Sequence, residues 1–261
     1  MHTKVPFHPC MHEIAHDQIA RLHLPVAPRC NIRCRFCERN ISPDRMGENT
    51  PGTASAILSP EQALIAAKKF VEQWGNQSVV GVAGPGEPLA NPETLETLAL
   101  VRKEYPSLKL CLCTNGLNLP DSIEAIKELA ITHLTVTVNG VDPAVVTRLQ
   151  PWVKKDGTIT MGKEGAGILI ENQLKGIKAA TRREIFVKIN TVVVPGINDF
   201  HVETVARTVS KRGAGILNLI PVIPRGDLSG IDSPGQCYLK GIKERCKTII
   251  PLFEKCKQCR A

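Results

Sequence analysis

The feature that most constrains the fold is an alternation of short apolar segments with amphipathic segments along most of the 261-residue chain. The apolar segments are rich in β-branched residues and almost continuously hydrophobic, as are strands buried on both faces. We predict six such strands, at residues 22–27, 78–83, 108–114, 134–139, 185–194 and 216–223. The segments between them have helical periodicity, which predicts helices at residues 60–74, 92–105, 121–129, 143–149, 168–181 and 200–212.

Six rounds of strand and helix predict one parallel sheet covered by its crossover helices. Six units are too few to close the usual eight-stranded barrel. The expected fold class is therefore α/β, a partial and open (β/α)6 barrel of the TIM type over residues 21–224. We expect a cluster-binding N-terminal extension at residues 1–20 and a helical C-terminal extension at residues 225–261. In such folds, functional residues lie at the carboxyl ends of the strands.

Composition and charge exclude several classes of protein. No apolar run reaches the roughly 18 residues that a membrane span needs, and the first residues, MHTKVPFHPC, lack the apolar core of a signal peptide. The formal net charge is +8, but the basic residues are scattered and aromatic residues make up only 4% of the chain. Both facts disfavour nucleic-acid binding. We therefore expect a cytoplasmic protein that binds neither membranes nor nucleic acids.

Ten cysteines in a chain without a signal peptide favour metal or cluster binding over disulfides. Cys30, Cys34 and Cys37 follow the first predicted strand with the spacing C-x3-C-x2-C. Three thiolates on one loop can hold three irons of a [4Fe–4S] cube and leave the fourth iron open. Structural zinc is the alternative, but it usually takes four ligands from paired C-x2-C units. The triplet therefore favours an iron–sulfur cluster with one open iron.

This triplet, placed after the first strand of a βα barrel and with Phe36 before its last cysteine, resembles the radical S-adenosylmethionine (SAM) superfamily. In that superfamily the open iron binds the amino and carboxyl groups of SAM. Reduction of the cluster then cleaves SAM to a 5′-deoxyadenosyl radical. The resemblance implies a [4Fe–4S] cluster with SAM as the cofactors of this chain, with Phe36 among the cofactor-binding residues.

Further candidate SAM-binding residues follow the later strands. The segment from Gly84 through Gly86 to Glu87 and Pro88 looks like a variant of the superfamily's GGEP element, in which backbone and acid meet the SAM amino group. A simple Gly-Pro turn is the alternative interpretation. Asn115 and Asn190 are candidates for the SAM carboxylate or ribose, with turn or strand-end capping as the alternative.

The resemblance can be narrowed, because five motifs occur in a fixed order. They are His8-Pro9-Cys10, the cysteine triplet, Ala83-Gly84-Pro85-Gly86, the segment Thr135–Asn139, and Cys256-Lys257-Gln258-Cys259-Arg260. Together they resemble the NifB family, the maturases that make the carbide-centred iron–sulfur core of the nitrogenase cofactor. The similarity spans essentially the whole chain. We expect a short form of the family, without the carrier domain that some of its members have.

The resemblance implies a two-step use of SAM. Two further [4Fe–4S] substrate clusters bind beside the SAM cluster, and one SAM donates a methyl group to a cluster sulfide. A second SAM supplies the radical that abstracts hydrogen from this methyl group. The carbon becomes a carbide as the two modules fuse into an eight-iron precursor. The implied partners are an iron–sulfur cluster donor protein, a reductant such as ferredoxin, and a carrier or scaffold protein that accepts the product.

The remaining cysteines supply candidate ligands for the substrate clusters. Cys10, Cys111 or Cys113, Cys256 and Cys259 lie in segments that could converge on the barrel mouth or its axis. His23, the odd polar residue of the first strand, could replace a thiolate, with a hydrogen-bonded core histidine as the alternative. The family pattern places its single cysteine of the third strand at Cys111, which leaves Cys113 as a small hydrophobic residue. We interpret Cys237 and Cys246 as buried helix cysteines.

Two catalytic candidates come from the resemblance alone. They are Glu48, in the loop after the triplet, and Asn139, after the fourth strand. The family loop carries an E-x-x-R-P-G element, but here Thr50 stands where a shortened alignment expects the arginine. This departure supports an alternative, a divergent enzyme of the same family that acts on another substrate. An iron–sulfur carrier protein is a third hypothesis.

Overall fold

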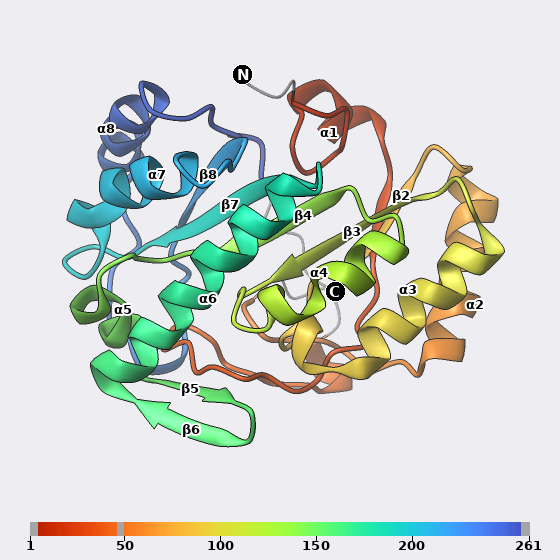
Figure 1. The fold of residues 1–261 in the computed structure, drawn as a ribbon, viewed down its shortest axis with the longest axis horizontal. Helices are drawn as coiled ribbons and strands as arrows, with labels where there is room; N and C mark the ends of the chain where they lie inside the picture. Colours follow the sequence, from red (N-terminus) through yellow and green to blue (C-terminus); the bar gives the residue numbers. More distant parts are fainter. Residues whose placement is uncertain (1–4, 46–49, 257–261) are drawn as a thin grey trace.

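The computed structural model describes residues 5–45 and 50–256. Six parallel strands form one curled sheet in the order β1-β2-β3-β4-β7-β8, which confirms the expected open, partial barrel (Figure 1). The strands are β1 (Arg21–His23), β2 (Val79–Val82), β3 (Lys109–Thr114), β4 (His133–Thr137), β7 (Phe186–Val193) and β8 (Ile216–Pro221). Five of them lie within two residues of their predicted boundaries, because the runs of buried apolar residues define them. The exception is β1, which ends at His23, four residues before its predicted end.

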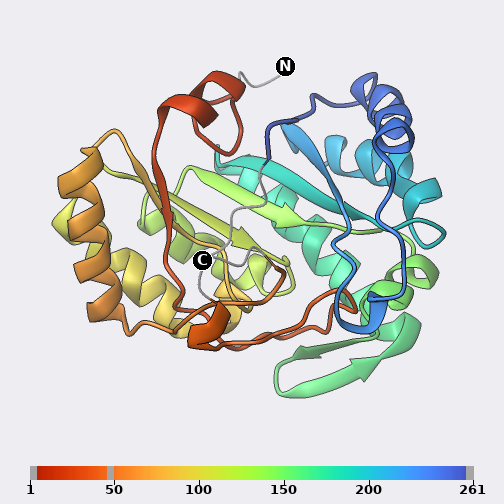
Figure 2. The same ribbon diagram turned by 180° about the vertical axis from the view of Figure 1, so that it is seen from behind.

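Apart from the helix at residues 13–18, which belongs to the N-terminal segment, the helices cover the convex side of this sheet (Figures 1 and 2). The two terminal segments lie against its open side. The α-helices are α1 (Glu13–Gln18), α2 (Pro60–Trp74), α3 (Pro92–Glu104), α4 (Leu119–Glu128), α5 (Pro143–Leu149), α6 (Gly162–Arg182), α7 (Val202–Ser210) and α8 (Gln236–Lys247). Short 3-10 turns are η1 (Pro43–Arg45), η2 (Pro88–Ala90), η3 (Asp199–His201) and η4 (Gly226–Leu228). None of these helices is long and apolar enough to cross a membrane.

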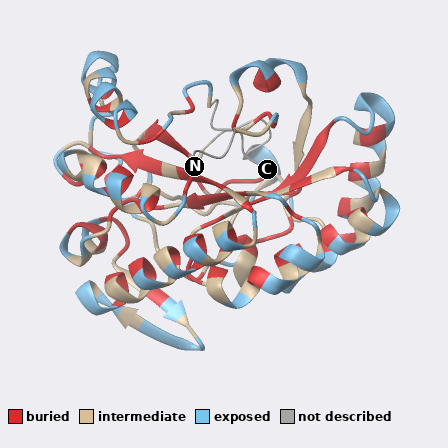
Figure 3. Cartoon of the chain, turned by 45° about the horizontal axis from the view of Figure 1, so that its top comes forward, coloured by how far each residue is buried: buried red, intermediate tan, exposed pale blue. Residues whose placement is uncertain are grey.

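Local sequence explains where α2 begins. The Ser59 hydroxyl accepts a hydrogen bond from the Gln62 N–H at 3.3 Å, and the Gln62 side chain accepts one from the Ser59 N–H at 2.9 Å. This reciprocal pair is a capping box, and Pro60 at the first helical position has no N–H to leave unpaired. Buried residues follow the strands and the helix faces that pack on them (Figure 3). The core is therefore a layer between sheet and helices, as the periodicity predicts.

A β-hairpin outside the main sheet was not predicted. It consists of β5 (Trp152–Lys155) and β6 (Thr158–Met161), which pair antiparallel. Its turn, Asp156-Gly157, has positive φ at both residues, 50° and 81°. An Asp-Gly pair favours this conformation, so the signal was present in the sequence. Helix α6 follows the hairpin directly and begins at Gly162, six residues before the predicted start at Ile168.

Candidate functional site

The cysteine triplet lies on the loop after β1, beside the carboxyl ends of the strands. Burial raises the pKa of the Cys30 thiol to about 11. The pKa of Cys34 is raised further by burial and then by the neighbouring Cys37 and Cys30. These three sulfurs therefore lie close enough to interact, and burial favours the protonated thiol at Cys30 and Cys34. Among residues 5–45 and 50–256, no three metal-binding side chains are gathered around a single metal-ion position.

The loop after β2 holds one side of the cysteine loop. The N–H of Gly86 donates to the Ala27 carbonyl at 2.6 Å, and the N–H of Glu87 donates to the Arg29 carbonyl at 2.8 Å. The backbone N–H of Arg29 also donates to the side-chain oxygen of Asn91 at 3.1 Å, and the side-chain amide of Asn91 donates to the Arg29 carbonyl at 2.9 Å. A Cβ on Gly86 would lie 2.2 Å from the Arg29 oxygen. Only glycine therefore fits at this position, whatever part it has in binding SAM.

The hairpin and the segment after β8 hold the other side. The N–H of Lys154 in β5 donates to the Asn31 carbonyl at 2.6 Å, and the Arg33 N–H donates to the Trp152 carbonyl at 3.2 Å. The N–H of Asp227 in η4 donates to the Arg35 carbonyl at 2.7 Å. The Asp227 carboxylate also pairs with Arg33 at 2.9 Å. The cysteine loop is thus anchored by backbone contacts from three directions.

Glu87 is buried, with 3% of its surface exposed. Its carboxylate accepts hydrogen bonds from the Asn115 N–H at 2.7 Å, the Leu89 N–H at 3.0 Å and the Thr114 hydroxyl. Burial raises the pKa of this carboxyl to about 7, although the three donors oppose the shift. The carboxylate therefore ties the end of β2 to the end of β3. Direct contact between Glu87 and SAM stays a prediction.

A paired set of amides joins the cysteine loop to the end of β3. The Asn115 amide donates to the Asn31 side-chain oxygen at 2.7 Å, and the Asn115 oxygen accepts from the Leu117 N–H at 2.9 Å. Asn31 is buried, and its amide nitrogen has no hydrogen-bond partner among the described residues. Such an orphaned donor needs an acceptor, and a cluster sulfide or the SAM carboxylate would supply one. The residues around the triplet therefore fit a SAM-binding cluster, and Asn31 is a functional candidate that sequence reasoning missed.

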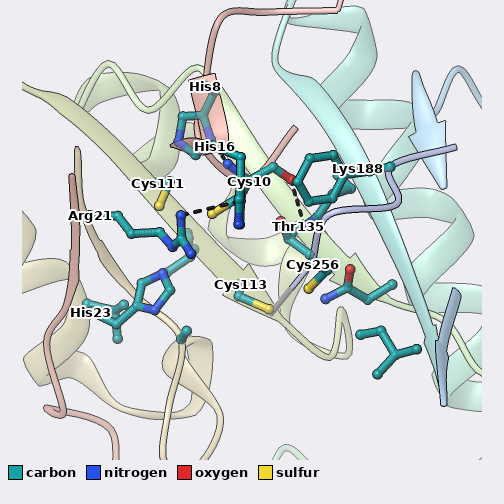
Figure 4. Close-up of a pocket in the computed structure, with 16 residues that line it drawn as sticks. His8, Cys10, His16, Arg21, His23, Cys111, Cys113, Thr135, Lys188 and Cys256 are labelled. Atoms are coloured by element: carbon teal, nitrogen blue, oxygen red, sulfur yellow. Dashed lines mark hydrogen bonds between the residues drawn. The ribbon is translucent and has the colours of Figure 1, made fainter. Parts of the chain in front are cut away.

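Four predicted ligands from distant segments line one pocket inside the barrel (Figure 4). Cys10 comes from the N-terminal segment, His23 from β1, Cys111 from β3 and Cys256 from the C-terminal segment. The structure therefore brings together both ends of its described chain, as the motif order implies. Two predicted site residues, Glu48 and Cys259, lie outside the described residues.

Cys113 lines the same pocket as Cys111. The two alternate with buried Leu110 and Leu112 along β3, so both thiols are on the concave face. Cys113 therefore reaches the pocket that the predicted ligands share, and its interpretation as a small hydrophobic residue stays a prediction. Across the sheet, a Cβ on Gly81 would lie 2.4 Å from the Cys111 sulfur. Glycine at this position in β2 leaves room for the Cys111 thiol.

The pocket also contains basic side chains that were not predicted as site residues, although His8 belongs to one of the family motifs. His8 is fully buried, its Nδ1 accepts from the Cys10 N–H at 3.1 Å, and its ring stacks on His133 with centroids 4.7 Å apart. Burial, and then the charge of His133, holds the pKa of His8 well below its usual value. Lys188 on β7 and Arg21 on β1 complete the set. The sequence did contain a signal for this site, because Lys188 is a charged residue inside the otherwise strongly apolar segment 185–194.

The other predicted residues have varied surroundings. Asn190 lines the pocket, and its side-chain oxygen accepts from the Asn218 amide at 2.9 Å. Asn139 is buried, and its side-chain oxygen accepts from the Val192 N–H at 2.9 Å. Phe36 is buried in an apolar cluster with Leu149 and Val222 as members. Their roles in catalysis or SAM binding stay predictions.

The prediction for the two cysteines of α8 was half right. Cys246 is fully buried, but Cys237 is exposed. Cys237 lies in the first turn of α8, where the helix has not yet packed against the barrel. Replacement of Cys237 is therefore a suitable control for replacement of the pocket cysteines.

Comparison with known proteins gives a consistent result. The Radical SAM superfamily model matches residues 24–209. The FeMo cofactor biosynthesis protein NifB of Methanocaldococcus jannaschii is 44% identical over 259 residues, which are 99% of this chain and 85% of that protein. The protein of the same name from Klebsiella pneumoniae is 40% identical over 265 residues. There the chain spans 99% of its own length but only 56% of the relative.

Solved structures support the fold. Streptococcus suis SuiB aligns with a TM-score of 0.65 at 13% identity, covering 94% of this chain and 53% of that one. A radical SAM methyltransferase from Sphaerobacter thermophilus aligns with a TM-score of 0.64 at 18% identity, covering 90% and 65%. At these identities the likeness concerns the arrangement of strands and helices, and the chemistry rests on the residues described above.

Proposed function

Because the chain belongs to the NifB family of FeMo cofactor biosynthesis proteins, within the radical SAM superfamily, we propose that it is a carbide-forming maturase. It fuses two [4Fe–4S] modules, inserts a carbon derived from SAM, and releases the eight-iron precursor of the nitrogenase cofactor. One observation carries the proposal: Cys10, His23, Cys111 and Cys256 converge on one pocket inside the barrel, separate from the cysteine triplet on the loop after β1. Cleavage of SAM by the cluster of the triplet does not by itself require this second set of iron ligands.

In this proposal the residues form two sites, one for the SAM cluster and one for the substrate clusters. Cys30, Cys34 and Cys37 would hold the SAM cluster on the loop after β1, and the buried Asn31 amide would donate to a sulfide of that cluster or to the SAM carboxylate. The Glu87 carboxylate holds the β3 end, and with it Asn115, against the cysteine loop. When bound, the cluster and SAM supply a methyl group and, on reduction, a 5′-deoxyadenosyl radical. The pocket ligands hold the substrate clusters below that site.

Such a reaction needs partners. An iron–sulfur donor protein delivers the two modules, a reductant such as ferredoxin supplies electrons, and a carrier or scaffold protein accepts the product. A second candidate function is a divergent enzyme of the same family with another substrate. The observation in its favour is Thr50, which stands in the loop position where the family pattern has arginine.

Two measurements test the proposal. The first is the iron content of anaerobically reconstituted protein, which we expect to correspond to three clusters rather than one. The second follows the fate of SAM with a deuterated methyl group. S-adenosylhomocysteine should form, and deuterium should enter 5′-deoxyadenosine, because the abstracted hydrogen comes from the transferred methyl group.

Matched cysteine variants sharpen the test. Cys111→Ser should abolish S-adenosylhomocysteine formation, because the methyl acceptor is a cluster held in the pocket. Cys237→Ser removes an exposed thiol and should leave both products unchanged. Cleavage of SAM without S-adenosylhomocysteine and without label transfer, in fully loaded protein, would contradict the carbide-forming reaction and favour the divergent enzyme.

A further inference from the structure

Lys188 is a buried cation in the wall of the ligand pocket. It lies in β7 beside Thr135 of β4, which in turn pairs with Cys113 of β3. These three neighbours point to the concave side of the sheet and line the pocket. Only 3% of the Lys188 surface is exposed. In Figure 4, Lys188 and Arg21 lie on opposite sides of the pocket with the cysteine sulfurs between them.

The described residues offset the charge of the Lys188 ammonium only in part. The Lys188 Nζ donates to the Cys10 carbonyl at 2.9 Å and lies 5.2 Å from the centre of the Phe253 ring. An ammonium has three N–H donors. One carbonyl acceptor and one ring face therefore leave at least one N–H of Lys188 without an acceptor in the described chain. Within residues 5–45 and 50–256, Lys188 makes no ion pair with a carboxylate, and no aspartate or glutamate lines the pocket.

Burial of a cation is costly unless an anion or several acceptors compensate it. The pocket offers thiols and imidazoles. A doubly positive [4Fe–4S] core becomes net negative once three thiolates bind it, as Cys10, Cys111 and Cys256 would do. We propose that Lys188 is the fixed counter-charge of this pocket, which selects an anionic, thiolate-bound iron–sulfur cargo. The inference rests on the proposed function and adds a residue that positions and discriminates the cargo without touching iron.

A purely structural role is the competing explanation, because the same side chain holds the Cys10 carbonyl. Three variants separate the two roles. Lys188→Arg keeps the charge and the donor, Lys188→Gln keeps a neutral donor, and Lys188→Met removes both. If charge matters, the Gln variant behaves like Met. If only the hydrogen bond matters, the Gln variant behaves like the parent protein.

The experiment uses the full chain with Cys30, Cys34 and Cys37 replaced by Ala, so that all retained iron belongs to the pocket. After anaerobic reconstitution, iron retention is titrated with a chelator, and the midpoint potential of the bound clusters is followed by electron paramagnetic resonance. Loss of a charge-assisted interaction should lower the apparent affinity about tenfold in the Gln and Met variants. Their midpoint potentials should move to more negative values, because reduction adds negative charge. The Arg variant should restore both quantities.

Lys109→Met is the matched control. Lys109 also holds a carbonyl of the N-terminal segment, that of Phe7 at 3.2 Å, but it does not line the pocket. Its iron retention and potential should equal those of the parent. Unchanged affinity and potential in Lys188→Gln would overturn the counter-charge role and leave the proposed function intact. A parent protein that retains no iron in the triplet-free background would instead overturn the proposed function itself.

Discussion

At the scale of single residues, Glu87 shows how a predicted ligand can act through its neighbours. Its carboxylate is surrounded by donors from Leu89, Thr114 and Asn115. In Glu87→Gln the amide NH2 must face one of these donors, which leaves buried N–H or O–H groups unpaired. We expect a loss of about 1–3 kcal/mol in unfolding free energy, together with weaker SAM binding. Reduced SAM affinity without any loss of stability, measured by binding and denaturation, would instead favour direct contact with SAM.

The raised pKa of Glu87 predicts a pH dependence. The folded protein retains the proton up to a pKa of about 7, whereas the ordinary pKa of a glutamate side chain is 4.5. Between these pH values the folded state binds more protons than the unfolded state, so the stabilising contribution of protonation falls as pH rises. Above about pH 7 it is lost. Denaturation of the iron-free parent and Glu87→Gln between pH 4.5 and 8 should show this decline only in the parent.

A further prediction at this scale concerns Gly81, where an added side chain would clash with Cys111. A Cβ here would lie 2.4 Å from the Cys111 sulfur and 2.7 Å from the Cys111 carbonyl oxygen. Gly81→Ala must displace the thiol and part of β3, so we expect about 1–3 kcal/mol of destabilisation and reduced iron in the pocket. Gly167→Ala is the control, since its Cβ would meet nothing within 4 Å and α6 would gain a better helix former. Equal iron content in the two variants would show that Cys111 is not a ligand.

At the scale of elements, the β5–β6 hairpin stabilises the cysteine loop through Trp152 and Lys154. Gly157 in its turn has φ of 81°, a conformation that valine adopts only with strain. Gly157→Val should therefore loosen the hairpin and expose the triplet. The measurement is the rate at which iodoacetamide alkylates Cys30 and Cys34 in iron-free protein, which should rise severalfold.

A second strained glycine provides the control for the hairpin. Gly196 follows β7 with φ of 70°, and like Gly157 it has nothing within 4 Å of an added Cβ. Gly196→Val introduces similar strain away from the hairpin and should leave the alkylation rate unchanged. If both variants accelerate alkylation equally, the effect is a general loss of stability and the hairpin has no special role.

At the scale of the whole molecule, the two terminal segments meet over the open side of the barrel. Lys255 pairs with Asp17 at 2.5 Å, and the rings of Phe253 and His16 are 5.8 Å apart. Exposed ion pairs contribute little stability, so cluster ligation should supply much of the order here. Iron and sulfide should therefore protect both segments from proteolysis. This protection should be lost in Cys10→Ser and retained in Cys237→Ser, and equal digestion with and without iron would show that Cys10 is not a ligand.

The sequence by itself determined the fold class and the cysteine triplet. Both are local properties: alternating periodicities specify strands and helices within short windows, and three cysteines within eight residues share one loop wherever it lies. The ends of helix α2 were predictable for the same reason, because the capping residues are neighbours along the chain. The Asp156-Gly157 turn was equally local, but each flanking strand has only four residues and β6 is mostly exposed, so neither shows the long apolar run that predicted the other strands.

Only the tertiary structure decided which residues share the pocket. Lys188 and Cys10 are 178 positions apart in sequence, and their contact depends on the register of β7 and on the path of the N-terminal segment. Cys113 and Glu87 were assigned from motif position, but their surroundings depend on pairing between neighbouring strands. A shift of one residue in such pairing turns every side chain to the other face of the sheet. The identity of a pocket residue is therefore a property of the assembled sheet, which no local window of sequence contains.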